Sequence, residues 1–140
     1  MPKWIYKLFN PVFTFLFRIT NGAFGSNFGG FTTLLLTTNG RKTNKKRTVP
    51  LGYFKDGPNY IIAASNSGSD KYPGWYFNII SNPEVSIQLR GGDKKVRAEI
   101  AKPAERERLW KKLVTEAPIY GRYEKQTTRI IPIVTLRTNN

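Results

Sequence analysis

The chain has 140 residues, of which 39% are hydrophobic and 14% aromatic, so it can form one domain with a buried core. Its 23 Lys and Arg against 9 Asp and Glu give a net charge of +14, which predicts an anionic partner: nucleic acid, a phosphorylated or carboxylated ligand, or an acidic membrane surface. With no cysteine and no histidine, disulfides, His-dependent nucleophile systems and the common zinc sites are excluded. Any reaction must use Tyr, Ser, Lys, carboxylates or a cofactor, and we expect no metal.

Residues 1–30 are predicted to form an amphipathic helical segment followed by a glycine-rich link from Gly22. Apolar residues recur there at helical spacing: Trp4, Ile5, Leu8, Phe9, Val12, Phe13 and Leu16. Asn10-Pro11 is typical of an N-cap and first helical position, which predicts two short helices. The segment is too short to span a bilayer and lacks a signal-peptide cleavage site, so we expect a cytoplasmic protein. Two hypotheses stay open for it: packing on its own domain, or contact with the inner face of the membrane or with an apolar substrate site.

Residues 31–140 are predicted to form a compact β domain. Strands are expected at 31–38, 47–54, 59–65, 84–90, 94–101 and 130–136. Turn residues at 56–58 and 91–93 predict two hairpins. Helices are expected at 74–81, which Asn82-Pro83 ends, and at 103–114, which Pro103 begins. Six strands joined mainly by hairpins favour a small antiparallel barrel with peripheral helices.

Five cations lie within the seven residues 41–47, between the first two predicted strands and after the turn pair Asn39-Gly40. Backbone amides in a glycine-containing turn, together with the forked side chains of Arg41 and Arg47, suit a phosphate. The alternative is a solvated hairpin tip whose lysines prevent edge-to-edge pairing of strands.

Two further groups of residues have the chemistry of a binding site. Small residues at the end of the third strand, Ala63 to Asn66, allow close approach of a planar ligand, and the start of the 74–81 helix offers free amides. Tyr120 and Tyr123 share a face if helical, and a tyrosine hydroxyl can orient or protonate a substrate. An ordinary strand–loop–helix corner and two surface tyrosines are the alternatives.

These motifs occur in a particular order from about Phe31 to Leu136. The motifs are Leu34 to Thr43, Arg47 to Leu51, Ala63 to Ser65, Pro73 to Asn78, Asn82 to Val85, Glu105 to Trp110, Pro118 to Tyr120 with Tyr123, and Arg129 to Val134. In this order they resemble the deazaflavin-dependent nitroreductase family. The resemblance implies a split β-barrel that uses reduced coenzyme F-420 as its hydride donor, and Asn66, Phe77 and Gly52 depart from the residues common in that family.

The resemblance also implies roles for individual residues. The phosphate and acidic tail of the coenzyme would be held by Arg41, Lys42, Thr43 and Arg47. The ring and ribityl part would contact Thr48, Val49, Pro50, Leu51 and Gly52, and then Ala63, Ala64, Ser65 and Asn66. The start of the helix would close the site through Gly74, Trp75, Tyr76, Phe77 and Asn78. Tyr120 would contact the ring or substrate, Tyr123 the substrate, and Ser65 the reactive end of the ring.

We therefore predict an oxidoreductase that transfers a hydride from reduced coenzyme F-420 to a quinone, a nitroaromatic or a similar lipophilic acceptor. Because the hydride comes from the cofactor, the protein positions the reactants, and Tyr120, Ser65 or water can deliver the proton. One alternative is a related split-barrel oxidoreductase that binds FMN. The other is a non-enzymatic basic module for nucleic acid or anionic lipid, which is less favoured because no aromatic residues alternate with the cations at 41–47.

Overall fold

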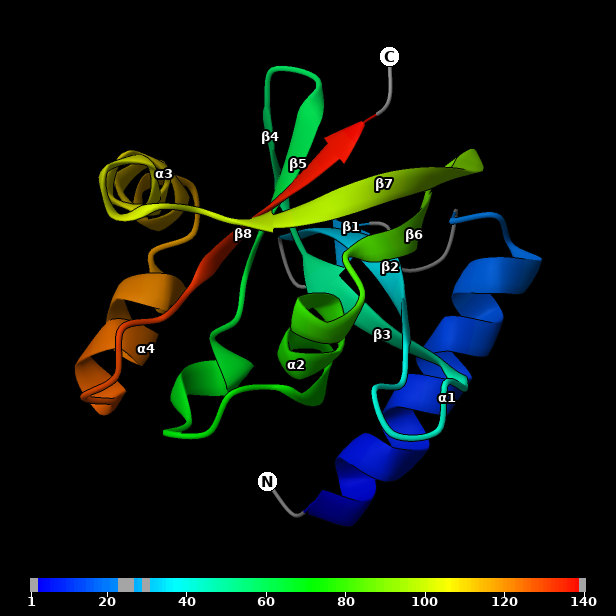
Figure 1. Cartoon of the computed structure of the whole chain (residues 1–140). Coiled ribbons are helices and arrows are strands. Elements are labelled where there is room, and N and C mark those ends of the chain that lie inside the picture. Colours follow the sequence, from blue (N-terminus) through cyan, green and yellow to red (C-terminus); the bar gives the residue numbers. More distant parts are fainter. Residues whose placement is uncertain (1–2, 23–26, 29–30, 139–140) are drawn as a thin grey trace.

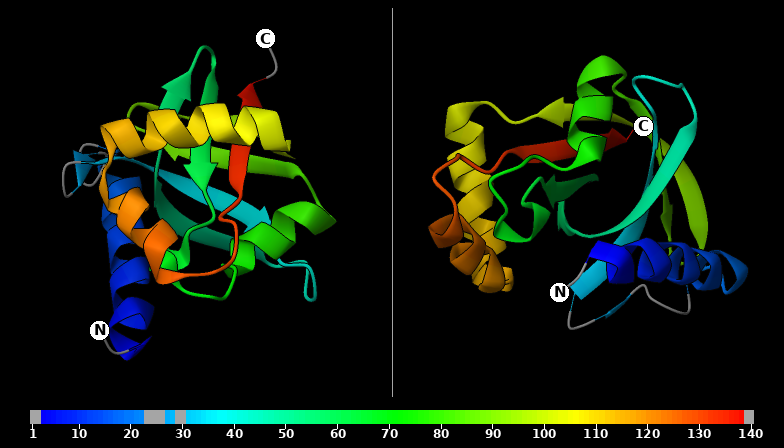
Figure 2. Two further views of the ribbon diagram at one scale, coloured as in Figure 1. Left: turned by 90° about the vertical axis from the view of Figure 1, so that its left-hand side faces the viewer. Right: turned by 90° about the horizontal axis from the view of Figure 1, so that it is seen from below.

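The computed structural model of the chain describes residues 3–22, 27–28 and 31–138, with side chains described for 11–22 and 32–138. In this part of the chain one antiparallel sheet curls into an open barrel with helices at its periphery (Figures 1 and 2). Its strands are β1 Asn27–Phe28, β2 Phe31–Asn39, β3 Lys46–Gly52, β4 Phe54–Asp56, β5 Asn59–Ala63, β6 Glu84–Leu89, β7 Gly92–Ile100 and β8 Ile133–Thr138. They are ordered β1-β2-β6-β7-β8-β5-β4. Strand β3 lies off this path and pairs with β2.

The described helices are α1 Lys3–Ile19, α2 Gly74–Ser81, α3 Pro103–Glu116 and α4 Ile119–Gln126, with a short 3-10 turn, η1, at Asn66–Gly68. In Figure 1, α3 and α4 lie on one side of the barrel, α1 lies on the other beside β3, and α2 lies between them. The predicted helices at 74–81 and 103–114 are confirmed, as is the barrel class.

The run Leu34-Leu35-Leu36 in β2 shows how the core is divided. Side chains alternate across a strand, so Leu34 and Leu36 point into the barrel with Ile62, Ile87 and Leu136 from other strands. Leu35 points outward, where Phe13 and Phe17 of α1 cover it. A third cluster joins the outer face of β5 and β8 to α3 through Ile61, Ile133, Leu109 and Leu113. Helices α1 and α3 are therefore each held by apolar side chains that are buried against the sheet.

The predicted strand count of six is wrong, because the described residues form eight strands. The strand expected at 47–54 divides at Tyr53: β3 pairs with β2, whereas β4 turns away to pair with β5. Gly52, at the division, has no side chain to resist the bend. The strand expected at 130–136 starts only at Ile133, since Pro132 has no N–H to donate to the sheet.

The N-terminal segment also differs from its prediction. Pro11 does not start a second helix, and α1 is continuous across it from Lys3 to Ile19. Burial of Phe13 and Phe17 on Leu35 fixes the part of the helix that follows Pro11, and offsets the hydrogen bond that a proline cannot donate. The link expected at 22–30 contains the short strand β1, and its residues 23–26 and 29–30 lie outside the described residues. The side chains of Trp4, Ile5, Leu8 and Phe9 are likewise outside the part of the chain that the structure describes. The division of the chain at residue 30 stays a prediction.

Candidate functional site

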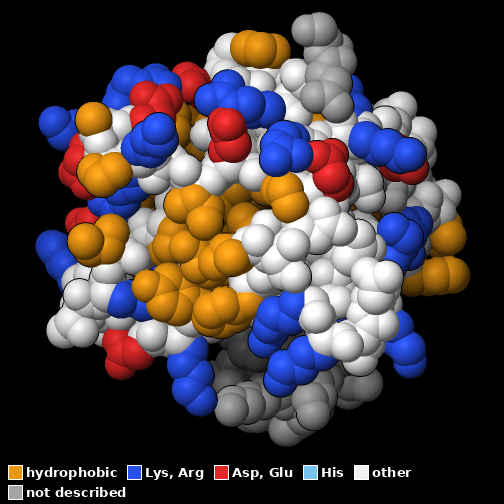
Figure 3. All heavy atoms as spheres, in the orientation of Figure 1, with side chains coloured by type: hydrophobic (Ala, Val, Ile, Leu, Met, Phe, Trp, Pro, Cys, Tyr) orange, Lys and Arg blue, Asp and Glu red, His pale blue; other side chains and the backbone are white. Residues whose placement is uncertain are grey.

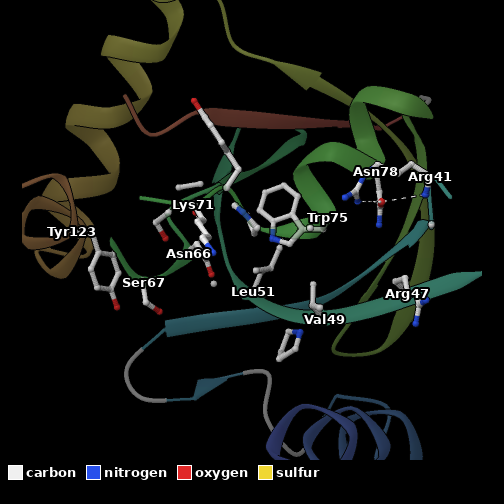
Figure 4. Close-up of a pocket in the computed structure, with 18 of the residues that line it drawn as sticks. Arg41, Arg47, Val49, Leu51, Asn66, Ser67, Lys71, Trp75, Asn78 and Tyr123 are labelled. Atoms are coloured by element: carbon white, nitrogen blue, oxygen red, sulfur yellow. Dashed lines mark hydrogen bonds between the residues drawn. The ribbon is translucent and has the colours of Figure 1, made fainter. Parts of the chain in front are cut away.

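A cavity of about 950 Å³ opens between β3, the end of β5, the 65–73 segment, α2 and α4. Its lining residues are Gly40, Arg41, Lys42, Thr43, Arg47, Val49, Pro50, Leu51, Gly52, Ala63, Ser65, Asn66, Ser67, Lys71, Tyr72, Pro73, Gly74, Trp75, Asn78, Tyr120 and Tyr123. Figure 4 shows that Arg41 and Arg47 lie at one end and Tyr123 and Ser67 at the other. The cavity is thus elongated, with a cationic end and an aromatic, polar end.

The cationic end is built on the turn between β2 and β3. Gly40 donates a backbone hydrogen bond to the Lys45 carbonyl at 2.8 Å and accepts one from Asn44 at 2.7 Å, which closes the turn. Asn44 has a positive φ of 58°, a conformation that asparagine tolerates better than most residues. A Cβ at Gly40 would lie 3.1 Å from the Lys45 oxygen, so a larger residue would require the turn to shift by a few tenths of an ångström.

Asn78 of α2 fixes Arg41 in this turn. Its Oδ1 accepts hydrogen bonds from the Arg41 backbone N at 3.2 Å and from Arg41 Nη1 at 3.1 Å. Its Nδ2 donates to Thr38 Oγ1 at 3.0 Å, and both Asn78 and Thr38 are buried. The Arg41 guanidinium also lies 5.1 Å from the centre of the Phe77 ring. An exposed arginine is in this way held in one orientation before any ligand binds.

Between the two ends the wall is apolar. Val49 and Leu51 of β3 pack against the barrel core, and Trp75 at the start of α2 is almost fully buried. Figure 4 shows Trp75 and Leu51 midway between the arginines and Tyr123. An apolar middle section suits the faces of a planar ring system.

The polar end is formed by the segment that leaves β5. Asn66 and Ser67 have positive φ values of 47° and 55°, and Gly68 follows at 80°. Consecutive left-handed residues without glycine are strained and are typical of ligand-binding segments. Gly68 is favoured here because its φ of +80° is rare for other residues and because a Cβ would lie 3.1 Å from the Tyr123 backbone on the neighbouring α4. Close contact with α4 therefore shapes this end of the cavity.

Tyr120 and Tyr123 come from α4 and meet edge to face, with ring centres 5.6 Å apart. Burial, and then the neighbouring Tyr123, raise the pKa of Tyr120 to about 12. Its hydroxyl therefore stays protonated at physiological pH and can donate a hydrogen bond, but it cannot act as a base. Tyr120 also lines a second, smaller cavity of about 90 Å³ between β4 and α3.

Sixteen of the twenty site residues predicted from the sequence line the cavity; four do not. Thr48 points to the outer side of β3, where it hydrogen-bonds Thr37 and Arg18. Ala64 is buried in the barrel core, Tyr76 stacks on Tyr72, and Phe77 lies outside, under Arg41. Period-two alternation in β3 could have separated Thr48 from its neighbours.

Sequence reasoning missed five lining residues, Gly40, Ser67, Lys71, Tyr72 and Pro73. Gly40 could have been found as the glycine of the turn itself. The other four lie in the 67–73 loop, whose course depends on contacts with α4 and the segment after it. Local sequence carries no signal for those contacts.

The surface outside the cavity is consistent with the high net charge. In Figure 3, Lys and Arg side chains surround a central group of hydrophobic side chains on the face where α2 lies. Phe77 and Ile80 of α2 are exposed hydrophobic residues. None of the helices in the described ranges is long and apolar enough to cross a membrane.

The cavity fits a long anionic cofactor with a planar ring. Its volume lies near the upper end of the roughly 300–1,000 Å³ usual for ligand pockets, its cations are oriented, and its middle is apolar. Fold and cavity together define a split β-barrel oxidoreductase of the kind that binds flavin-like cofactors.

Comparisons with known proteins agree. The profile of the F420H2-dependent quinone reductase family matches residues 12–138. An F420H2-dependent quinone reductase of Mycobacterium tuberculosis is 40% identical over 126 residues, which cover 86% of this chain and 84% of that protein. A solved F420H2-dependent reductase has a TM-score of 0.69 at 38% identity, covering 75% of this chain and 93% of its own. A structure described as a domain-swapped dimer has a TM-score of 0.73 at 32% identity, covering 96% and 97%.

The chain belongs to the F420H2-dependent quinone reductase family. It is accordingly an F420H2-dependent oxidoreductase, and coenzyme F-420 is its cofactor. This result selects the deazaflavin hypothesis over the FMN and nucleic-acid alternatives.

Proposed function

We propose that the protein reduces a lipophilic quinone in the cavity described above, with the coenzyme's anionic part at the Arg41 end. The observation that carries this proposal is the arrangement of one continuous cavity, which has Arg41, Lys42 and Arg47 at one end and Tyr120, Tyr123 and the cation Lys71 toward the other. The quinone preference is supported by the family and by the Mycobacterium tuberculosis relative, which is itself named an F420H2-dependent quinone reductase.

The residues at the cationic end bind rather than react. Arg41 and Arg47 present guanidinium forks to phosphate and carboxylate oxygens, and Lys42 adds charge. Asn78 holds Arg41 in place, so less side-chain entropy is lost on binding. Lys45 and Lys46 do not line the cavity and contribute through the field alone.

The residues at the other end position the acceptor. When bound, the reduced deazaflavin supplies a hydride, and a quinone that receives it needs one further proton to become a hydroquinone. Tyr120 keeps its proton at neutral pH and lines the cavity, which supports a role as hydrogen-bond donor to the acceptor oxygen. Ser65 is buried at the cavity wall and offers a second hydroxyl. The proton itself comes from water, either directly or through the hydroxyl of Tyr120 or Ser65, which water then reprotonates.

The test is oxidation of reduced coenzyme F-420 by a short-chain quinone, followed by the return of deazaflavin absorbance. We expect turnover with the wild type and a fall in kcat of about ten-fold or more in Tyr120→Phe, the size of a lost positioning hydrogen bond. Tyr60→Phe, a change in the barrel core, is the matched control. Turnover with a nitroaromatic but with no quinone, or with reduced FMN alone, would contradict the proposal.

We further propose that α1 places the protein at the inner face of the cell membrane. While Phe13 and Phe17 face the sheet, Val12, Phe15 and Ile19 on the opposite side of α1 are 58%, 62% and 61% exposed. Their spacing of three and four residues puts them on one helix face. An exposed apolar stripe on a protein of charge +14 suits an anionic bilayer, where a lipophilic quinone resides.

Sedimentation with vesicles tests this placement. We expect the wild type to bind vesicles that contain anionic lipid and Phe15→Glu to lose that binding. Ile130→Glu, at a residue that is 74% exposed but distant in sequence from α1, serves as control. Equal binding by the two variants would contradict membrane contact through α1, without bearing on quinone reduction by the soluble assay.

A further inference from the structure

Arg129, in the connection from α4 to β8, holds the 64–71 segment by its backbone. Its Nε donates to the Ser69 carbonyl at 2.9 Å. Its Nη2 lies 2.9 Å from the Ser65 carbonyl oxygen, 3.1 Å from that of Ala64 and 3.3 Å from that of Lys71. All four acceptors are about sixty residues earlier in the chain, in the segment that forms the polar end of the cavity.

Neighbouring contacts reinforce this attachment. The guanidinium lies over the ring of Tyr72, 4.6 Å from its centre, and Tyr72 lines the cavity. Thr127 donates its hydroxyl hydrogen bond to Asp70 Oδ1 at 2.6 Å and accepts one from the Arg129 backbone N at 3.3 Å. Residues 127–129 thus contact both the start of the 64–71 segment and its end.

The held segment is the strained one. Asn66, Ser67 and Gly68 all have positive φ values, and such a conformation persists only when its surroundings impose it. Inside the loop, Asn66 Nδ2 donates to the Lys71 carbonyl at 3.0 Å and the Lys71 backbone N to Ser69 Oγ at 3.1 Å. These local bonds leave the loop's relation to the barrel unfixed. Arg129 ties four of the loop's carbonyls to the segment before β8, in addition to the Thr127–Asp70 bond and the contact of Gly68 with α4.

Arg129 itself does not line the cavity, and no carboxylate among the described residues forms an ion pair with it. Only a planar fork can bond carbonyls on both sides of the loop at once; a lysine ammonium would reach fewer of them. The Nε and Nη2 atoms of Arg129 thus bind backbone carbonyl oxygens and neither line the cavity nor pair with a surface carboxylate of the described residues.

We propose that Arg129 is a positioning residue for the reaction: it fixes the 64–71 segment so that Ser65, Asn66 and Ser67 form the wall at the polar end of the cavity. This role rests on the proposed function only for its effect on turnover. Its effect on the loop is a property of the protein without ligand.

The first test is hydrogen–deuterium exchange without coenzyme, comparing Arg129→Lys with the wild type. The Gly68 and Ser69 amides are hydrogen-bonded within the loop, to the Ser65 and Asn66 carbonyls, and report its order. We expect their exchange to become about ten-fold faster or more in Arg129→Lys, while amides of β2 and β6 stay unchanged. Arg97→Lys, which replaces an exposed arginine bonded to Glu84, is the matched control. Unchanged loop exchange in Arg129→Lys would overturn the proposal.

The second test is kinetic, with reduced coenzyme F-420 and a quinone. Arg129→Lys should lower kcat about ten-fold, with a smaller change in coenzyme affinity, since the Arg41 end is untouched. Free guanidinium at non-denaturing concentration should restore part of the activity of Arg129→Ala, whereas ethylammonium should not. If both variants only lose thermal stability, with kcat of the folded protein unchanged, Arg129 is merely structural and the proposal fails. If the wild type itself does not turn over, the proposed function fails, and the exchange experiment still decides the role of Arg129.

Discussion

Replacing Asn78 by alanine should weaken coenzyme binding without removing any cation. The Asn78 amide orients Arg41 through two hydrogen bonds and anchors to buried Thr38 through a third. Without it, Arg41 keeps its charge but must be ordered when the ligand binds. Ordering one such side chain costs about 0.5–1.5 kcal/mol, which predicts an increase in Kd of about 2- to 12-fold. The lost hydrogen bonds should also lower the free energy of unfolding by about 2 kcal/mol.

Fluorescence titration with coenzyme F-420 and urea unfolding measure the two effects separately. Asn82→Ala is the matched control, because Asn82 follows the same helix and bonds the Glu84 backbone away from the cavity. Arg41→Ala, which removes the cation, should weaken binding more than Asn78→Ala does. If Asn78→Ala lowers stability but leaves Kd unchanged, or if Asn82→Ala weakens binding equally, pre-orientation of Arg41 is refuted.

Two further predictions concern α4 and its loop. Because burial raises the pKa of Tyr120 from about 10 to about 12, the folded state keeps a proton that the unfolded chain loses as pH rises. Stability from this group is complete below pH 10 and is lost toward pH 12, so between pH 8 and 11 the wild type should lose about 1 kcal/mol more than Tyr120→Phe in urea unfolding. Equal losses would refute the shifted pKa. Gly68→Ala should cost about 1–3 kcal/mol in the same assay, because φ is +80° and the new Cβ would lie 3.1 Å from the Tyr123 backbone. Gly57→Ala, with a positive φ but open space, should cost less.

The elements with strong local signals were predictable from the sequence. Pro103 begins α3, Gly74 begins α2, and Gly91 forms the turn between β6 and β7, as expected. The break of β3 from β4 was not foreseen, because apolar residues continue through Tyr53 while the pairing partner changes from β2 to β5. A one-dimensional pattern cannot report which strand a residue pairs with.

The candidate site shows the same limit. The cations at 41–47 stand out locally, and Arg41, Lys42 and Arg47 do line the cavity. Arg129 does not stand out, since its partners are carbonyl oxygens about sixty residues away. A backbone carbonyl has no sequence identity, so only the folded arrangement of α4, the loop and β8 reveals what this side chain does.

The most direct measurement of the central claim is the affinity of the protein for coenzyme F-420, by fluorescence titration of the wild type, Arg47→Ala and Arg97→Ala. Arg47 lines the cationic end of the cavity, whereas Arg97 of β7 forms an exposed ion pair with Glu84 of β6. We predict saturable binding by the wild type and by Arg97→Ala, and binding at least about ten-fold weaker for Arg47→Ala, the usual cost of a lost charge-assisted contact. No binding by the wild type at micromolar protein, or equal affinity of all three proteins, would contradict the account.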